Sequence, residues 1–184
     1  HSLGLENLTV NANPNAANQS RKIRVLMVCL GNICRSPTAH GVLEKLIQDK
    51  GLSEAIEVDS AGTSTYHIGD HPDPRSIAAA QRRGYSLEKQ VARQVSPNDF
   101  QEFDYVLAMD ADNLQHLVSA APGGSKAKVQ LLLDYASGET ESVPDPYLGG
   151  GLQGFETVLD LVEGACQRLL EQLLQELPTA VREQ

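Results

Sequence analysis

Cys29 and Arg35, with five residues between them, are the pair in this sequence that most directly suggests chemistry. A cysteine thiolate can attack the phosphorus of a phosphate monoester, and a guanidinium can bind the phosphate oxygens in bidentate fashion. Backbone N–H groups of the intervening loop, next to a helix N-terminus, would bind an anion and lower the pKa of the thiol. The pair therefore predicts a nucleophile that acts on bound phosphate. The alternative is a buried strand-end cysteine beside an unrelated surface arginine, because this spacing also arises by chance.

A strand, a tight loop and a helix are expected to position this pair. The apolar run over residues 25–29 is typical of a strand buried on both faces, and it ends on Cys29. Ser36 suits the N-cap of a helix, and Pro37 suits the first helical position. An apolar face follows at helical spacing, made of Ala39, Val42, Leu43, Leu46 and Ile47. The loop between strand and helix should therefore hold the anion.

The rest of the chain alternates strands with helices. Further strands are predicted over residues 55–60, 104–109 and 129–133, and a long amphipathic helix over 155–174. This alternation predicts an α/β three-layer sandwich, in which helices cover both faces of a four-stranded parallel sheet and ligands bind at the carboxyl ends of the strands. We expect the Asn-rich residues 1–20 to form a flexible tail, partly derived from an expression tag, and residues 21–184 to form one domain.

Composition narrows the function classes. A net charge of −9 over 184 residues argues against a general nucleic-acid binder. No apolar run approaches the ~18 residues of a membrane span, and no signal peptide is visible. Three cysteines are an odd number and too few for a disulfide scaffold, which favours a reducing, cytoplasmic location. The five histidines show no metal-ligand spacing, so neither a metal nor a cofactor is expected.

Five motifs, taken together and in order, resemble the low-molecular-weight protein tyrosine phosphatases. They are CLGNICRSP, DSAGTSTYHIGDHPDPR, VARQV, FDYVLAMDADNL and DPY, and the resemblance covers about residues 22–177. It implies a flavodoxin-like sheet of strand order 2-1-3-4. It also implies metal-free hydrolysis of phosphotyrosine and small aryl phosphates through a cysteinyl-phosphate. The implied partners are tyrosine-phosphorylated proteins, with phosphate and other oxyanions in the active site of a monomer.

By this resemblance Cys29 is the nucleophile and Arg35 clamps the phosphate. Asn32 would hold the loop in a strained turn, since Asn tolerates the left-handed conformation. Ser36 can donate its hydroxyl to the Cys29 sulfur, and Ser60 is expected to hydrogen-bond Asn32. The whole loop is expected to bind phosphate, through Leu30, Gly31, Asn32, Ile33, Cys34, Arg35 and Ser36.

Asp145 and two tyrosines are expected on the other side of the site. The resemblance makes Asp145, which lies between two prolines, the general acid and base, whereas its spacing alone also fits an ordinary turn aspartate. Tyr66 and Tyr147 lie in polar loops without a core to fill. The resemblance implies that they wall the substrate slot, and plain exposed residues are the alternative. Ile33 completes the slot and favours an aryl phosphate, because the similar protein-arginine phosphatases carry Thr at the matching position.

The other two cysteines receive different interpretations. The resemblance implies that peroxide can join Cys34 to Cys29 in a reversible disulfide that protects Cys29, and a spectator thiol is the alternative. Cys166 lies on the apolar stripe of the last helix and is expected in the core. Arg83 stands where some family members place a histidine in the network around Asn32, which leaves that part of the network open.

Three other functions remain as alternatives to an aryl phosphatase. An arsenate reductase needs a relay of further cysteines, and only Cys166 remains after Cys34. A protein-arginine phosphatase is disfavoured by Ile33. A non-catalytic phosphopeptide-binding module would need neither a nucleophile nor an acid such as Asp145.

Overall fold

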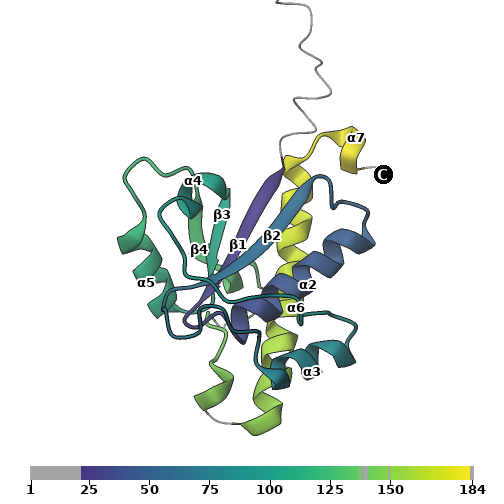
Figure 1. Ribbon diagram of the computed structural model, residues 1–184. Coiled ribbons are helices and arrows are strands. Elements are labelled where there is room, and N and C mark those ends of the chain that lie inside the picture. Colours follow the sequence, from purple (N-terminus) through teal and green to yellow (C-terminus); the bar gives the residue numbers. More distant parts are fainter. Residues whose placement is uncertain (1–21, 137, 139–140, 149, 183–184) are drawn as a thin grey trace, which may run out of the picture.

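A four-stranded, all-parallel sheet forms the centre of the molecule (Figure 1). The computed structural model describes residues 22–136, 138, 141–148 and 150–182, so the tail predicted at residues 1–20 lies outside the described residues. The strand order is β2-β1-β3-β4, as predicted. The strands are β1 (Ile23–Cys29), β2 (Ile56–Gly62), β3 (Tyr105–Ala108) and β4 (Lys128–Leu131).

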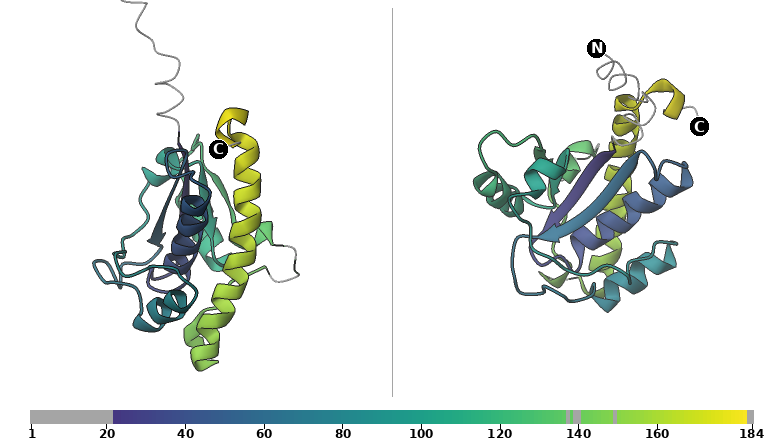
Figure 2. Two further views of the ribbon diagram at one scale, coloured as in Figure 1. Left: turned by 90° about the vertical axis from the view of Figure 1, so that its right-hand side faces the viewer. Right: turned by 45° about the horizontal axis from the view of Figure 1, so that its top comes forward.

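Helices cover both faces of the sheet, which confirms the predicted three-layer α/β sandwich (Figures 1 and 2). One face packs against α2 (Arg35–Asp49), α3 (Pro74–Arg82) and α6 (Gly151–Glu176). The opposite face packs against α4 (Asp99–Glu102) and α5 (Ala111–Ala120). Shorter elements are the 3₁₀ helices η1 (Leu132–Tyr135) and η2 (Pro146–Leu148), and α7 (Thr179–Arg182) near the end of the chain.

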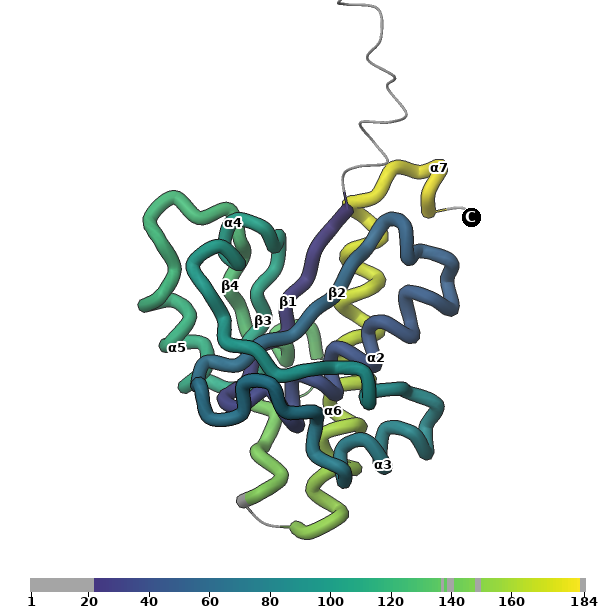
Figure 3. Tube along the Cα trace, viewed as in Figure 1, coloured from purple at the N-terminus to yellow at the C-terminus, as the bar shows by residue number. Residues whose placement is uncertain are grey.

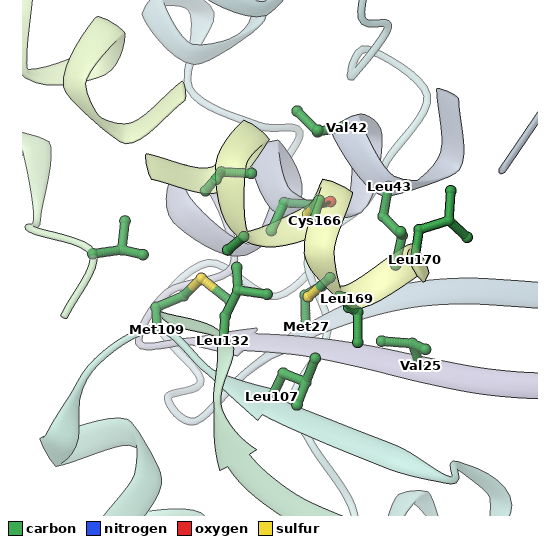
Figure 4. Close-up of a cluster of buried hydrophobic side chains, with 14 of the residues drawn as sticks. Val25, Met27, Val42, Leu43, Leu107, Met109, Leu132, Cys166, Leu169 and Leu170 are labelled. Atoms are coloured by element: carbon green, nitrogen blue, oxygen red, sulfur yellow. Dashed lines mark hydrogen bonds between the residues drawn. The ribbon is translucent and has the colours of Figure 1, made fainter. Parts of the chain in front are cut away.

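Strand β1 is buried on both faces, so its side chains alternate between two cores. Val25 and Met27 face the larger core with α2 and α6, whereas Leu26 and Val28 face the smaller core with α4 and α5. Figure 4 shows the larger core, where Cys166 of α6 lies among apolar side chains, as expected. This double burial fixes the end of β1, from which the loop over residues 30–34, called the phosphate loop below for the role predicted for it, leads to α2.

Several element boundaries differ from the predictions. Helix α2 begins at Arg35 and has no side-chain cap, because Ser36 Oγ bonds inside the preceding loop instead. Strand β2 continues to Gly62, two residues beyond the predicted end. The fourth strand ends at Leu131, and the two apolar residues after it turn into η1. None of the helices in the described ranges has the length and apolar character that crossing a membrane requires.

Candidate active site

A cavity of about 130 Å³ opens where β1 ends. Three loops meet there: the phosphate loop that joins β1 to α2, the loop after β2, and the loop that leads into η2. The structure thus brings together residues far apart in the sequence, and the cavity is lined by Cys29, Leu30, Gly31, Ile33, Cys34, Arg35, Ser64, Tyr66, His67, Asp145 and Tyr147. Of these, Ser64 and His67 were not predicted to belong to the site.

The Cys29 sulfur lies at the base of the loop, where two hydrogen-bond donors surround it. The backbone N–H of Asn32 lies 3.3 Å from Sγ, and Ser36 Oγ lies 3.0 Å from it. The Asn32 amide donates to Ser36 Oγ at 2.8 Å, which leaves the serine proton for the sulfur at 3.0 Å or for the more distant Ala61 carbonyl at 3.4 Å. Both donors can bind negative charge that develops on the sulfur.

Asn32 holds the phosphate loop in its turn. Its φ of 58° is the one positive value among described non-glycine residues. The side-chain amide donates to Ser36 Oγ and to Ser60 Oγ, the latter at 3.0 Å, and its carbonyl accepts the backbone N–H of Arg93 at 3.1 Å. Each polar atom of this buried amide therefore has a partner, which offsets the cost of the left-handed conformation.

Ser60 extends this network away from the cavity. Its hydroxyl lies 3.3 Å from Gln90 Oε1 and 3.3 Å from His40 Nδ1. Arg83, the residue considered for this part of the network, lies elsewhere and pairs with carboxylates of α6, namely Glu156, Asp160 and Glu163. Gln90 and His40 therefore occupy the place considered for Arg83, and sequence reasoning missed both.

Arg35 is buried and oriented from behind by two acceptors. Its Nη1 donates to Asp110 Oδ2 at 2.6 Å and to the Val143 carbonyl at 3.1 Å. Within the described residues the Arg35 side chain makes its hydrogen bonds through Nη1, and it lines the cavity. A guanidinium held in this way presents its free edge to a bound anion. Asp110 also caps α5 by accepting the Asn113 N–H.

The slot wall is held by a second, more exposed cluster. The Tyr147 hydroxyl donates to Asp73 Oδ2, and the Tyr147 N–H donates to Asp145 Oδ1 at 3.0 Å. The Arg75 guanidinium lies over the Tyr147 ring, 5.0 Å from its centroid. Burial opposes ionisation of Asp73, but hydrogen bonds from Arg75 and Tyr147 outweigh it and lower the pKa of Asp73 to about 2. Tyr66 stands apart, with 87% of its surface exposed.

Cys34 lies buried behind the loop, close to the slot wall. Burial raises the pKa of the Cys34 thiol to about 11, although hydrogen bonds with Tyr147 and Ser76 act in the opposite direction. Cys34 therefore remains a thiol near neutral pH. All three cysteines are free in this structure. The described residues contain no group of three or more His, Cys, Asp or Glu side chains that could hold a metal ion.

Comparisons with known proteins agree with this geometry. A family model described as low molecular weight phosphotyrosine protein phosphatase matches residues 24–179. A protein of Pongo abelii named low molecular weight phosphotyrosine protein phosphatase is 45% identical over 157 residues, which cover 84% of this chain and 98% of the relative. A crystal structure of a protein tyrosine phosphatase from Entamoeba histolytica is 42% identical with a TM-score of 0.80, covering 84% of this chain and 99% of that one.

A third similar protein is named for a different substrate. The crystal structure of a Drosophila arginine phosphatase is 33% identical to this chain, with a TM-score of 0.76. It covers 82% of this chain and 98% of its own.

Proposed function

This chain belongs to the low molecular weight phosphotyrosine protein phosphatase family, and from that premise we propose that the cavity hydrolyses phosphotyrosine with Cys29 as nucleophile, Arg35 as phosphate clamp and Asp145 as general acid and base. The family is one of hydrolases. The observation that carries the assignment is the pair of donors on Cys29 Sγ, at the base of a cavity that Asp145 also lines.

In the first step, the Cys29 thiolate attacks phosphorus, so that an S–P bond forms while the bond from phosphorus to the aryl oxygen breaks. The free edge of Arg35 and the N–H groups of the loop bind the equatorial oxygens as charge develops on them. Protonated Asp145 gives its proton to the leaving phenolate. Asp145 fits this role because the backbone N–H of Tyr147 orients its carboxyl at the rim of the slot.

In the second step, water attacks the cysteinyl-phosphate while the Asp145 carboxylate takes a proton from that water. The S–P bond breaks, the electron pair returns to sulfur, and inorganic phosphate is released. Ser36 and the Asn32 N–H stabilise the departing thiolate, because both hydrogen bonds strengthen as negative charge returns to Sγ. The two steps restore the thiolate and use no group beyond those of the chain and water.

The substrate preference follows from the slot. Tyr147 and Ile33 line the cavity with Tyr66 at its rim, which suits a flat aryl group. The likeness to the Drosophila arginine phosphatase makes phosphoarginine the second candidate substrate. Arsenate reduction is disfavoured because Cys166 is fully buried beneath α2 and cannot serve an electron relay.

A further proposal concerns redox control of Cys29. Cys34 lines the same cavity as Cys29, which supports a peroxide-driven disulfide in which both thiols are oxidised and peroxide is reduced to water. Mild peroxide should give a 29–34 link by mass spectrometry, and stable Cys29 sulfonic acid without the link would refute it.

Three free thiols support a cytoplasmic location, and we further propose that the enzyme acts as a monomer on tyrosine-phosphorylated proteins.

Hydrolysis of para-nitrophenyl phosphate in the presence of EDTA tests the central proposal. The wild-type protein should be active and inhibited by vanadate, and Cys29→Ser should abolish turnover. Asp145→Asn should lower kcat by roughly 10²–10⁴ while vanadate still binds. Phosphotyrosine and phosphoarginine peptides compared by kcat/KM decide between the two substrates. Near-normal turnover of either variant, or activity that EDTA removes, would contradict the mechanism.

A further inference from the structure

The segment over residues 91–95, the VARQV motif, lies against the phosphate loop from outside the active site. In Figure 3 the chain between α3 and α4 runs past the end of β2. There Gly62 pairs with Gln94, its N–H donates to the Arg93 carbonyl at 2.8 Å, and its carbonyl accepts the Val95 N–H at 2.8 Å. A Cβ at Gly62 would lie 2.8 Å from the Leu30 carbonyl, so the end of β2 that pairs with this segment packs directly on the loop.

Arg93 is the residue of this segment that reaches the loop. Its backbone N–H donates to Asn32 Oδ1 at 3.1 Å, and that carbonyl oxygen is the end of the amide opposite to Ser36 and Ser60. The orientation of the Asn32 amide therefore depends on this N–H, since a rotated amide would place a donor against a donor.

The Arg93 side chain is anchored by two carboxylates. Nε and Nη2 donate to Asp59 Oδ2 at 3.2 and 3.1 Å, and Nη1 and Nη2 donate to the two oxygens of Asp99 at 3.0 and 3.1 Å. Asp59 belongs to β2, directly before Ser60, and buried Asp99 begins α4 and also accepts the Ser96 N–H. The planar fork of an arginine matches this double contact, which the single ammonium of a lysine cannot reproduce.

We propose that Arg93 is a positioning residue for the phosphate loop. By binding Asp59 and Asp99 it fixes the backbone N–H that orients Asn32, and Asn32 in turn fixes the two donors at the Cys29 sulfur. This inference rests on the proposed function of Cys29, but the measurements that test it, Cys29 alkylation and vanadate inhibition, require only a thiolate and an oxyanion site. A purely structural ion pair would stabilise the fold without changing alkylation or inhibition.

Arg83→Met provides the matched control. Arg83 also pairs with several carboxylates, on α6, but its contacts do not include the phosphate loop. Arg93→Met and Arg83→Met should therefore both lower the melting temperature, and only Arg93→Met should alter the active site.

The decisive measurements are the pH dependence of Cys29 alkylation by iodoacetate and the inhibition constant for vanadate, each on full-length protein. Arg93→Met keeps the backbone N–H but loses the two carboxylate anchors that hold it against Asn32. A displaced N–H should weaken about one buried hydrogen bond, so the alkylation pKa should rise by about one unit and vanadate binding should weaken by about tenfold. Arg93→Lys should show a smaller shift in the same direction and serves if the Met variant does not fold. Unchanged alkylation and inhibition in a folded Arg93 variant would overturn the proposal, whereas failure of wild-type hydrolysis would overturn only the phosphatase assignment.

Discussion

The floor and the wall of the cavity are held in different ways. On the floor, Cys29, Asn32, Arg35 and Ser36 are buried, and each side chain has hydrogen-bond partners at or below 3.0 Å. On the wall, Tyr147 is 48% exposed, and its ring is anchored through a hydroxyl contact with Asp73 and the Arg75 guanidinium above it. The floor is therefore preorganised for a phosphate group, while the wall can adapt to what the phosphate is attached to.

Among the substitutions that test this difference between floor and wall, Arg35→Lys should have the largest effect. A lysine keeps the charge but lacks the bidentate edge, so it cannot hydrogen-bond Asp110, the Val143 carbonyl and the phosphate at the same time. We expect kcat/KM for para-nitrophenyl phosphate to fall by roughly 10²–10³, the range for loss of a transition-state donor. Asp110→Asn should cost less, because it only loosens the guanidinium. A larger loss for Asp110→Asn than for Arg35→Lys would contradict the clamp.

Substitutions at Asn32 test whether the floor depends on the amide or on the backbone turn. Asn32→Gly tolerates the φ of 58° but lacks the side-chain amide, whereas Asn32→Ala lacks the amide and also disfavours this positive φ. We expect kcat to fall about tenfold for the glycine variant, as for loss of buried hydrogen bonds, and further for the alanine variant. Equal losses in the two variants would show that the left-handed turn contributes nothing of its own. Steady-state kinetics and thermal melts on both proteins separate activity from folding.

The floor was largely predictable from the sequence, because its parts are local. Cys29, the loop and α2 are contiguous, so strand and helix patterns suffice to place them. The contact between Asp110 and Arg35 was not predicted, although the register of the sheet explains it. Val28 pairs with Ala108 in β1 and β3, and the Met109 N–H donates to the Val28 carbonyl, so the residue after Met109 must lie beside the phosphate loop.

The wrong prediction of a Ser36 helix cap and the open question of Arg83 in the network around Asn32 both concern side-chain contacts that depend on the folded path of the chain. The sequence shows Ser36 as a good helix cap, but the loop offers its hydroxyl stronger partners in Cys29 and Asn32. Likewise nothing local distinguishes Arg83 from Gln90 as a partner of Ser60, since only the path of the chain after α3 decides which of them faces β2. A motif predicts which residues matter more reliably than which contacts they make.

The smallest effect is expected on the wall, from Tyr147→Phe. This change keeps the ring over the slot but removes the hydroxyl that donates to Asp73, so KM for an aryl phosphate should rise about twofold to fivefold with little change in kcat. Tyr66→Phe is the matched control, because the Tyr66 hydroxyl makes no hydrogen bond to the described residues, and it should leave KM unchanged.

The same contact also has an expected pH dependence. Because the pKa of Asp73 is lowered to about 2, its carboxylate persists well below neutral pH, and the Tyr147 contact should break only as the pH falls toward that value. The KM ratio of Tyr147→Phe to wild type should therefore stay constant from about pH 4 to pH 8. A ratio that collapses near pH 6 would mean that a different group holds the wall. If Tyr147→Phe lowered kcat as much as Asn32→Ala does, the distinction between an adaptable wall and a preorganised floor would be wrong.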